Sequence, residues 1–289
     1  MRTRSGTLGR AAGRCLAALL AAASASADGK PLRVASLNLT ADEILVEILP
    51  PERLVAVTRW ADEPGSSNIV GRIPPSTLRF QKADMERLVA LAPDLVVVSE
   101  YTDADFLKLI ERSGLRAHRM YGLHSLPGIR AAILSLGEAV GEAAEAQRLV
   151  SRYDAVLAEL SRRLRGARPP RVLYWAEPHT AGADTAIGAL IEGGGGINVA
   201  AELGISGIAP IGAERAFLAD PDVVMIGSGW KTAEALRSHP LLSQMRAVRD
   251  GHVVELPTEL LVTLSQHAAE ACWRLGSLLH PTRVPRPAP

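Results

Sequence analysis

One phrase of sequence occurs twice in this chain and limits the folds that the chain can adopt. The first copy, ERLVALAPDLVVV, begins at Glu86, and the second, ERAFLADPDVVMI, begins at Glu214. In both copies the aspartate of the Pro-Asp pair, Asp94 or Asp222, is interpreted as a turn-capping residue. The copies lie 128 positions apart (214 − 86), whereas a solenoid repeats a short unit at least three times. The repeat therefore predicts two similar lobes.

Strand and helix patterns alternate on both sides of each copy. Within a copy, the pattern predicts a short helix that ends before the proline and then a buried strand. A capping box from Thr40 to Glu43 is predicted to open a helix after the first strand of the chain. Strands that alternate with helices indicate parallel β-α units. Further strands are predicted at RVASLN, LVAVTRW and RVLYWA, which begin at Arg33, Leu54 and Arg171.

The segment between the two lobes has helical character only. From 126 to 165, apolar residues recur at helical spacing and no strand pattern occurs. The part from Glu142 onward predicts one helix of about six turns, which ends before Gly166 and Pro169. The predicted fold class is therefore α/β, with two Rossmann-like lobes, a central parallel sheet in each, and a single long α-helix that joins them. A ligand is expected in the cleft between the lobes, near the carboxyl ends of the strands.

The N-terminus has the pattern of a cleavable secretion signal. Basic residues precede the apolar run CLAALLAAA, which leads to Ala25-Ser26-Ala27. This order is typical of a signal peptide, and cleavage is expected after Ala27. The alternative, a membrane anchor, is disfavoured because the run is shorter than the roughly 20 residues that span a bilayer. We therefore expect an exported protein with a signal peptide (1–27), an N-terminal lobe (28–125), connecting helices (126–168), a C-terminal lobe (169–281) and a disordered tail (282–289).

Composition and motifs argue against several other classes of protein. Charged residues make up 22% of the chain and no basic tract with interleaved aromatic residues occurs, so a nucleic-acid partner is not expected. Without the signal peptide only Cys272 remains, so no internal disulfide can form, and Cys272 is interpreted as a core residue. The GGGG run at 193–196 lacks the phosphate-loop pattern and is interpreted as a helix stop. No nucleophile elbow or convincing triad is found, so no catalytic residue, metal site or resident cofactor is predicted.

Several segments together resemble a known family. RVASLNLTADEIL, LVAVTRWADEP, GGGGINVAAELG and the two copies of the repeated phrase are similar to the periplasmic substrate-binding proteins of ABC importers for iron-siderophores, cobalamin and haem. The resemblance runs from about Arg33 to Leu279. It implies a non-catalytic protein that captures a ferric siderophore, cobalamin or haem and delivers it to the transmembrane permease of an ABC importer.

The resemblance also implies a role for the repeated glutamates. In that family each lobe carries a surface glutamate that docks on arginines of the permease, and by position these residues map onto Glu86 and Glu214. Carboxylate–arginine pairs form charge-assisted, bidentate hydrogen bonds. The residues alone allow another role, because a glutamate in the first turn of a helix interacts favourably with the helix dipole.

Aromatic residues are scarce, at 4% of the chain, so their positions are informative. Four of them fall at or just after the carboxyl end of a predicted strand, and a flat ligand would stack on such rings. The alternative is that each ring fills the core of its lobe. The four predicted ligand-binding aromatic residues are Trp60, which also matches a ligand-contacting position of the family, Tyr101, Trp175 and Trp230.

Polar ligand contacts are predicted near the same loops. Arg59, Arg72 and Arg79 lie near the predicted cleft of the first lobe, where they are suited to hold anionic oxygens of a siderophore or of haem propionates. Glu259 occupies a loop where the family often places a polar ligand contact. Ala209 and Ser99 stand where some cobalamin binders of the family have aromatic residues, which weakens a cobalamin assignment.

Two alternative functions remain open from the sequence. A receptor for free zinc or manganese on the same fold would need about four converging ligands, and the histidines to consider are His118, His124, His179 and His267. They form no His-x-x-x-His pair, which does not favour this function. A chelatase-like enzyme on a similar frame is disfavoured by the signal peptide, because such chemistry is expected in the cytoplasm. The sequence does not identify the ligand.

Overall fold

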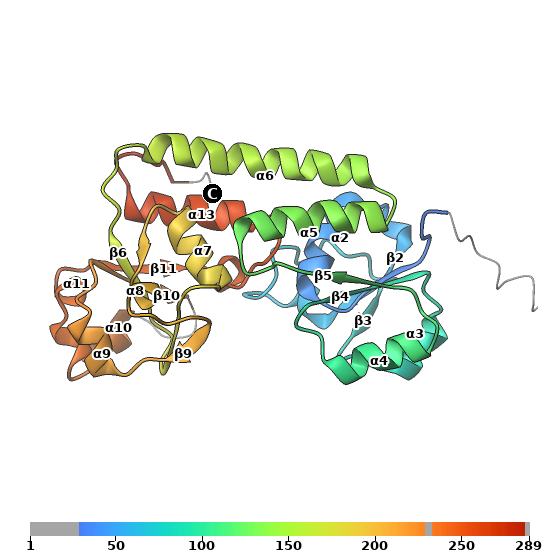
Figure 1. The fold of residues 1–289 in the computed structure, drawn as a ribbon, viewed down its shortest axis with the longest axis horizontal. Coiled ribbons are helices and arrows are strands. Elements are labelled where there is room, and N and C mark those ends of the chain that lie inside the picture. The colour runs from blue at the N-terminus through green and yellow to red at the C-terminus, as the bar shows by residue number, and fades with distance from the viewer. Residues whose placement is uncertain (1–28, 229–232, 287–289) are drawn as a thin grey trace, which may run out of the picture.

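Two α/β lobes lie side by side beneath one long helix, α6 (Ala143–Leu164), which extends over both (Figure 1). The structure is a computed structural model and describes residues 29–228 and 233–286. Helix α6 has 22 residues, so the prediction of about six turns from Glu142 is confirmed. The predicted signal peptide lies outside the described residues. Within these ranges, no helix is both long enough and apolar enough to cross a membrane.

The N-terminal lobe is built around one parallel sheet. Its strand order is β3-β2-β1-β4-β5, and Val34 of the central strand lies opposite Leu54 and Leu95 of its two neighbours. All carboxyl ends of these strands therefore lie at one edge of the sheet. The strands are β1 (Val34–Ser36), β2 (Leu54–Thr58), β3 (Leu78–Phe80), β4 (Leu95–Ser99) and β5 (Ala117–Met120), and the helices are α2 (Leu39–Ile48), α3 (Met85–Leu91), α4 (Ala104–Arg112) and α5 (Leu126–Ala139).

The C-terminal lobe has a second parallel sheet, of order β11-β10-β6-β8, and a separate antiparallel pair, β7 and β9. Its strands are β6 (Arg171–Tyr174), β7 (His179–Ala181), β8 (Ile197–Asn198), β9 (Ile208–Pro210), β10 (Val223–Gly227) and β11 (Val253–Leu256). Its helices are α7 (Ala186–Gly193), α8 (Val199–Glu202), α9 (Ala213–Leu218), α10 (Ala233–Ser238), α11 (Arg246–Arg249), α12 (Thr258–Leu261) and α13 (Ala268–Leu279). The two-lobed α/β fold with parallel sheets is thus confirmed.

The repeated phrase forms the same structural unit in both lobes. Each copy supplies a short helix, α3 or α9, then Pro-Asp, then an inner strand, β4 or β10. Asp94 Oδ2 accepts hydrogen bonds from the amides of Leu32 and Arg33 at 2.8 and 2.9 Å, and Asp222 Oδ2 accepts one from the amide of Arg171 at 3.0 Å. Each aspartate therefore fixes the start of the neighbouring strand, which supports its structural interpretation.

An arginine completes this unit in each lobe. The Arg33 guanidinium donates to the carbonyl of Leu91 at 2.7 Å, at the end of α3. The Arg171 guanidinium donates to the carbonyls of Ala219 and Asp220 at 2.9 Å, just after α9. The last carbonyls of a helix have no partner within the helix, so each arginine satisfies groups at the helix end that the repeated phrase forms.

Two interpretations of small residues are confirmed. Helix α7 ends at Gly193, and Gly195 has a φ of +84°, a conformation that favours glycine. The GGGG run is therefore a helix stop and turn. Cys272 is fully buried within α13, and burial raises the pKa of its thiol to about 12, so it is an inert core residue.

The predicted capping box is wrong. The N-cap of α2 is Asn38, whose side-chain oxygen accepts a hydrogen bond from the amide of Ala41 at 2.9 Å. Thr40 is already inside the helix, and the Glu43 side chain bonds to distant segments instead of to the helix start. A tertiary contact has replaced the local one that the sequence pattern suggested.

The expectation of a disordered tail does not hold for residues 282–286. Val284 is buried, and the Trp273 indole N–H donates to the carbonyl of Pro285 at 3.0 Å. The Arg283 guanidinium donates to the carbonyl of Arg165 at 2.9 Å, just beyond α6. This segment is therefore anchored to α13 and to the end of α6. Residues 287–289 lie outside the described residues.

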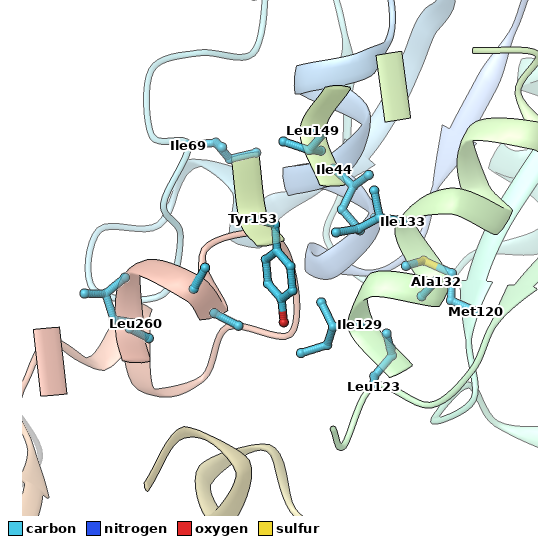
Figure 2. Close-up of a cluster of buried hydrophobic side chains, with 14 of the residues drawn as sticks. Ile44, Ile69, Met120, Leu123, Ile129, Ala132, Ile133, Leu149, Tyr153 and Leu260 are labelled. Atoms are coloured by element: carbon cyan, nitrogen blue, oxygen red, sulfur yellow. The ribbon is translucent and has the colours of Figure 1, made fainter. Parts of the chain in front are cut away.

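A single hydrophobic core lies under α6 and belongs to both lobes. It joins buried side chains of β1, α2 and α5 in the first lobe with those of α7, β11 and α13 in the second, through residues of α6 such as Leu149, Tyr153 and Leu160. Figure 2 shows Tyr153 in this cluster, with Ile129 of α5 and Leu260 of α12. The Tyr153 hydroxyl donates to the carbonyl of Leu126 at 3.1 Å. Each lobe also has a smaller core of its own.

Replacement of Tyr153 with alanine should destabilise the protein by about 3 kcal/mol or more, because it removes a buried aromatic side chain from the shared core. Chemical denaturation measures the change. Tyr121→Ala is the matched control: Tyr121 is exposed, and the Arg119 guanidinium lies 5.1 Å from the centroid of its ring, so its loss should cost less than about 1 kcal/mol. Equal effects of the two substitutions would contradict a shared core centred on Tyr153.

Candidate functional site

A pocket of about 260 Å³ lies at the carboxyl edge of the first sheet. Trp60 follows β2 in a short 3-10 helix (Arg59–Asp62), and 44% of its surface is exposed. The Arg59 guanidinium stacks over the Trp60 ring, 4.0 Å from its centroid, which is a cation–π arrangement. The pair offers a ligand an aromatic surface beside a positive charge. The pocket is lined by Leu37, Asn38, Thr58, Trp60, Phe80, Gln81, Lys82 and Ala83.

A second pocket, of about 500 Å³, lies at the carboxyl edge of the second sheet. Trp175 lines it directly after β6, but only 4% of the Trp175 surface is exposed and the ring packs in the core of this lobe. Trp175 thus packs in the core of its lobe, the alternative that the sequence left open, and it also borders the pocket. The other lining residues are Tyr174, Ala176, Glu177, His179, Ile226 and Gly227.

The predicted arginines do not all gather at the first pocket. Only Arg59 stacks on Trp60. The Arg72 guanidinium pairs with Glu47 of α2 at 2.5 Å, and Arg72 does not line the Trp60 pocket. The Arg79 guanidinium pairs with Asp62 at 2.7 Å and donates to the carbonyls of the preceding loop, so it organises that loop.

The remaining predicted ligand contacts occupy varied positions. Tyr101 follows β4 and is 63% exposed, but it lines neither of the two pockets. Glu259 lies in the first turn of α12, and its backbone carbonyl accepts a hydrogen bond from the Asn68 side chain of the other lobe at 3.1 Å. Trp230 lies outside the described residues.

The two predicted docking glutamates occupy equivalent positions. Glu86 is in the first turn of α3 and Glu214 in the first turn of α9. Both side chains are exposed, and neither forms a hydrogen bond or an ion pair with the part of the chain that the structure describes. Helices α3 and α9 both lie on the side of their lobes remote from α6 (Figure 1). Each of these two helices thus carries one exposed and unpaired carboxylate.

The histidines of interest are dispersed. His118 is in β5, where burial, together with the charge of Arg116, lowers the pKa of its side chain. His267 precedes α13, and its Nδ1 lies 3.6 Å from Glu270 Oε2. His179 lines the second pocket, and His124 is exposed. Among the described residues, no three His, Cys, Asp or Glu side chains are grouped so that they could hold a metal ion.

Some residues of the first pocket were not singled out from the sequence. Asn38, Phe80 and Lys82 line it because β1 and β3 end beside β2. Their position in the sequence was the available signal, because each residue lies at or within two residues of the end of a parallel strand. Strand β3 has only three residues, however, which is too short to give a period-two pattern.

The model of the periplasmic binding protein family matches residues 34–260, which is most of the chain. The chain belongs to this family. A relative described as a cobalamin-binding protein, from Halobacterium salinarum, is 26% identical over 270 residues, which cover 89% of this chain and 72% of the relative.

Solved members of the same architecture confirm the fold. The apo form of a periplasmic heme-binding protein, RhuT from Roseiflexus sp. RS-1, superposes with a TM-score of 0.71 at 24% identity and covers 87% of this chain and 98% of its own. The Helicobacter pylori protein CeuE, in a nickel–histidine complex, has a TM-score of 0.74 at 18% identity and covers 89% of this chain and 85% of its own. At these identities the likeness concerns the two-lobed periplasmic binding protein fold alone.

A buried carboxylate stands behind the first pocket of this periplasmic binding protein. Asp42 is fully buried in the first turn of α2, and its Oδ2 accepts hydrogen bonds from Thr58 Oγ1 at 2.6 Å and from the Thr58 amide at 3.1 Å. Burial raises the pKa of Asp42 from 3.8 to about 7, although the hydrogen bonds from Ser36 and Thr58 oppose this shift. The folded protein therefore holds a proton that the unfolded chain releases near pH 4.

Stability should consequently fall as the pH rises from about 4 to about 7, since in this window the unfolded state binds fewer protons than the folded state. Asp42→Asn removes the titrating group, so its melting temperature should decline less between pH 5 and pH 8 than that of the unmodified protein. Calorimetry across this pH range measures the melting temperatures of both proteins. Asp105→Asn, on an exposed part of α4, is the control and should keep the original decline. An unchanged decline in Asp42→Asn would show that Asp42 does not titrate there.

Proposed function

We propose that this protein captures a metal chelate or a tetrapyrrole between its lobes and delivers it to the permease of an ABC importer. The observation that supports this most is the matched pair Glu86 and Glu214. They occupy the same turn of the same repeated unit, are exposed, and have no partner among the described residues. An isolated surface carboxylate has little structural use, whereas two at equivalent positions suit a partner with two-fold symmetry.

The permease is the partner that fits these carboxylates. Arginine side chains would bind each one through bidentate, charge-assisted hydrogen bonds. Charged pairs at an interface mainly set orientation and association rate, which is what a receptor needs if it must dock, release its ligand and leave. The helix dipole of α3 or α9 adds a favourable interaction in the free protein, so both roles of these residues are compatible.

The ligand class follows from the two pockets. Trp60 with Arg59 in the first lobe and Trp175 in the second border the carboxyl edges of the two sheets, where ligands of open α/β sheets bind. A large, flat molecule would use the exposed Trp60 ring. Anionic groups on it would use Arg59 and Lys82. A ferric siderophore, cobalamin or haem has this combination, and the names of the relatives, which include cobalamin and heme binders, agree with it.

Export completes the proposal. We infer that residues 1–27 are a signal peptide cleaved after Ala27, since delivery to a permease requires the protein on the outer side of the inner membrane. The family is periplasmic by name, which agrees with this location. The protein itself acts as a binder, with no catalytic step.

Titration of the purified protein with haemin, a ferric siderophore, cobalamin and Zn²⁺ identifies the ligand through quenching of tryptophan fluorescence. Trp60→Ala should weaken binding of the preferred chelate about tenfold, which corresponds to about 1.4 kcal/mol, because the exposed ring is lost. Leu109→Ala, which removes an exposed apolar side chain from α4, should leave affinity unchanged. Binding of Zn²⁺ alone would favour the free-metal receptor, and metal insertion into a porphyrin by the purified protein would favour a chelatase. Either result would contradict the proposal.

The double substitution Glu86→Ala with Glu214→Ala should abolish uptake of the ligand and leave its affinity within about twofold of the original. Uptake is measured in the native organism with the altered gene in place of its own, and affinity is measured on the purified protein. The matched control, Glu111→Ala with Glu234→Ala, removes exposed acids of α4 and α10 and should leave uptake intact. Loss of affinity in the first double variant would assign these carboxylates to the pocket or the fold.

A further inference from the structure

Glu43, in α2 of the first lobe, is a buried carboxylate with four hydrogen-bond donors. Only 1% of its surface is exposed. Its Oε1 accepts hydrogen bonds from the amide and the side-chain nitrogen of Asn68, at 3.0 and 2.8 Å. Its Oε2 accepts hydrogen bonds from the hydroxyls of Thr263 and Ser265, at 3.1 and 2.5 Å. In addition, the Gln266 side chain donates to the Glu43 backbone carbonyl at 2.9 Å.

These donors come from both lobes. Asn68 lies in the loop before β3 of the first lobe, whereas Thr263, Ser265 and Gln266 form the connection between α12 and α13 of the second. Glu43 Oε1 thus binds donors of its own lobe, and Glu43 Oε2 binds donors of the C-terminal lobe. The Asn68 side chain also donates to the carbonyl of Glu259 in α12, at 3.1 Å, which adds a second link between the lobes.

The segment that Glu43 holds leads to the second pocket. Glu259 belongs to α12, and the Thr258 hydroxyl at the start of α12 donates to the carbonyl of Ser228, just after β10. Gly227, the last residue of β10, lines the second pocket. Hydrogen bonds and the first turn of α12 therefore connect Glu43, through Asn68, to the edge of the second sheet.

A buried carboxylate is tolerated only while its donors stay in place. If the lobes separated or rotated, Thr263 and Ser265 would move away and Glu43 Oε2 would lose both of its donors. The penalty makes one arrangement of the lobes strongly preferred. Ordinary apolar packing is less selective, because apolar contacts have no preferred direction.

We propose that Glu43 is an interlobe latch, a positioning residue that fixes the separation of the two lobes and thereby sets the width of the ligand-binding space. As far as it concerns ligand, the inference rests on the proposed function. The hydrogen bonds of Glu43 themselves do not depend on that function. It explains why this part of α2 carries an acid inside the molecule, where the local sequence suggested a helix cap.

The separation of the lobes is measured by pulsed electron paramagnetic resonance between spin labels at Glu111→Cys in α4 and Arg249→Cys in α11, both exposed positions. The native Cys272 is fully buried with a strongly raised pKa, so it stays unlabelled. In the labelled protein we expect one narrow distance distribution. Glu43→Gln should broaden the distribution or shift its mean, because an amide nitrogen replaces an acceptor among the donors.

The control is Glu47→Gln, one turn further along the same helix. Its carboxylate pairs with Arg72 and with Arg152 of α6, and with no residue of the α12–α13 connection. The distance distribution should not change. If Glu43→Gln fails to fold, Thr263→Val combined with Ser265→Ala removes the donors of the second lobe and leaves Glu43 in place, and this variant should broaden the distribution in the same way. A folded variant of either kind with the original distribution overturns the latch.

Affinity provides the second measurement. With haemin, a ferric siderophore and cobalamin as probes, Glu43→Gln should weaken the binding of whichever probe binds the unmodified protein by about tenfold, and Glu47→Gln should not. If no probe binds the unmodified protein, the proposed ligand class fails, while the distance measurement still decides the latch. A broadened distribution with unchanged affinity would show that the latch does not set the binding space.

Discussion

The apolar core beneath α6 ties the two lobes into one folded unit. Helices α2, α5, α7 and α13 and several strands of each lobe bury side chains in it, and α6 adds buried side chains between Ala146 and Leu160. Any large rotation of one lobe against the other would expose part of this core, at roughly 25 cal/mol for each Å². The lobes therefore have limited freedom, and the polar contacts of Glu43 add directional selectivity to the apolar packing.

This constraint positions the functional features. Both lobes pack against the same core beneath α6. Each parallel sheet has a tryptophan at its carboxyl edge, Trp60 in one lobe and Trp175 in the other. The same arrangement places α3 and α9 on the side of the molecule remote from α6. Their unpaired glutamates keep a fixed spacing only because the lobes do. The fold itself therefore holds the proposed docking surface at a fixed spacing.

The features that could be predicted from the sequence are those that depend on local patterns or on repetition. The long helix follows from helical spacing without any strand pattern, and the Pro-Asp turns follow from a phrase that is used twice. The position of Trp60 followed from the rule that ligands meet the ends of parallel strands. Four short strands, β3, β7, β8 and β9, were missed because two or three residues show no periodicity. Strand β1 is equally short, but it was predicted as part of the longer segment RVASLN.

The side chains whose partners are distant could not be predicted from local pattern. Glu43 matched a capping box, but its donors include Ser265, which lies 222 positions away. Arg72 was placed near the cleft by its sequence neighbours, yet Glu47 of α2 binds it elsewhere. Arg79 likewise serves the carbonyls of its own loop. In each case a charged group pairs with donors or acceptors that the tertiary fold brings close to it. Rules based on sequence spacing do not identify such partners.

Native-state hydrogen exchange tests most directly whether the lobes form one unit. Amides of the inner strands β4 and β10, one from each lobe, should exchange with the same free energy and the same denaturant dependence, because the shared core opens only when the whole protein unfolds. If β10 exchanged through a separate opening at clearly lower free energy than β4, the lobes would be independent domains. The common core would then not hold the binding space and the docking surface in place.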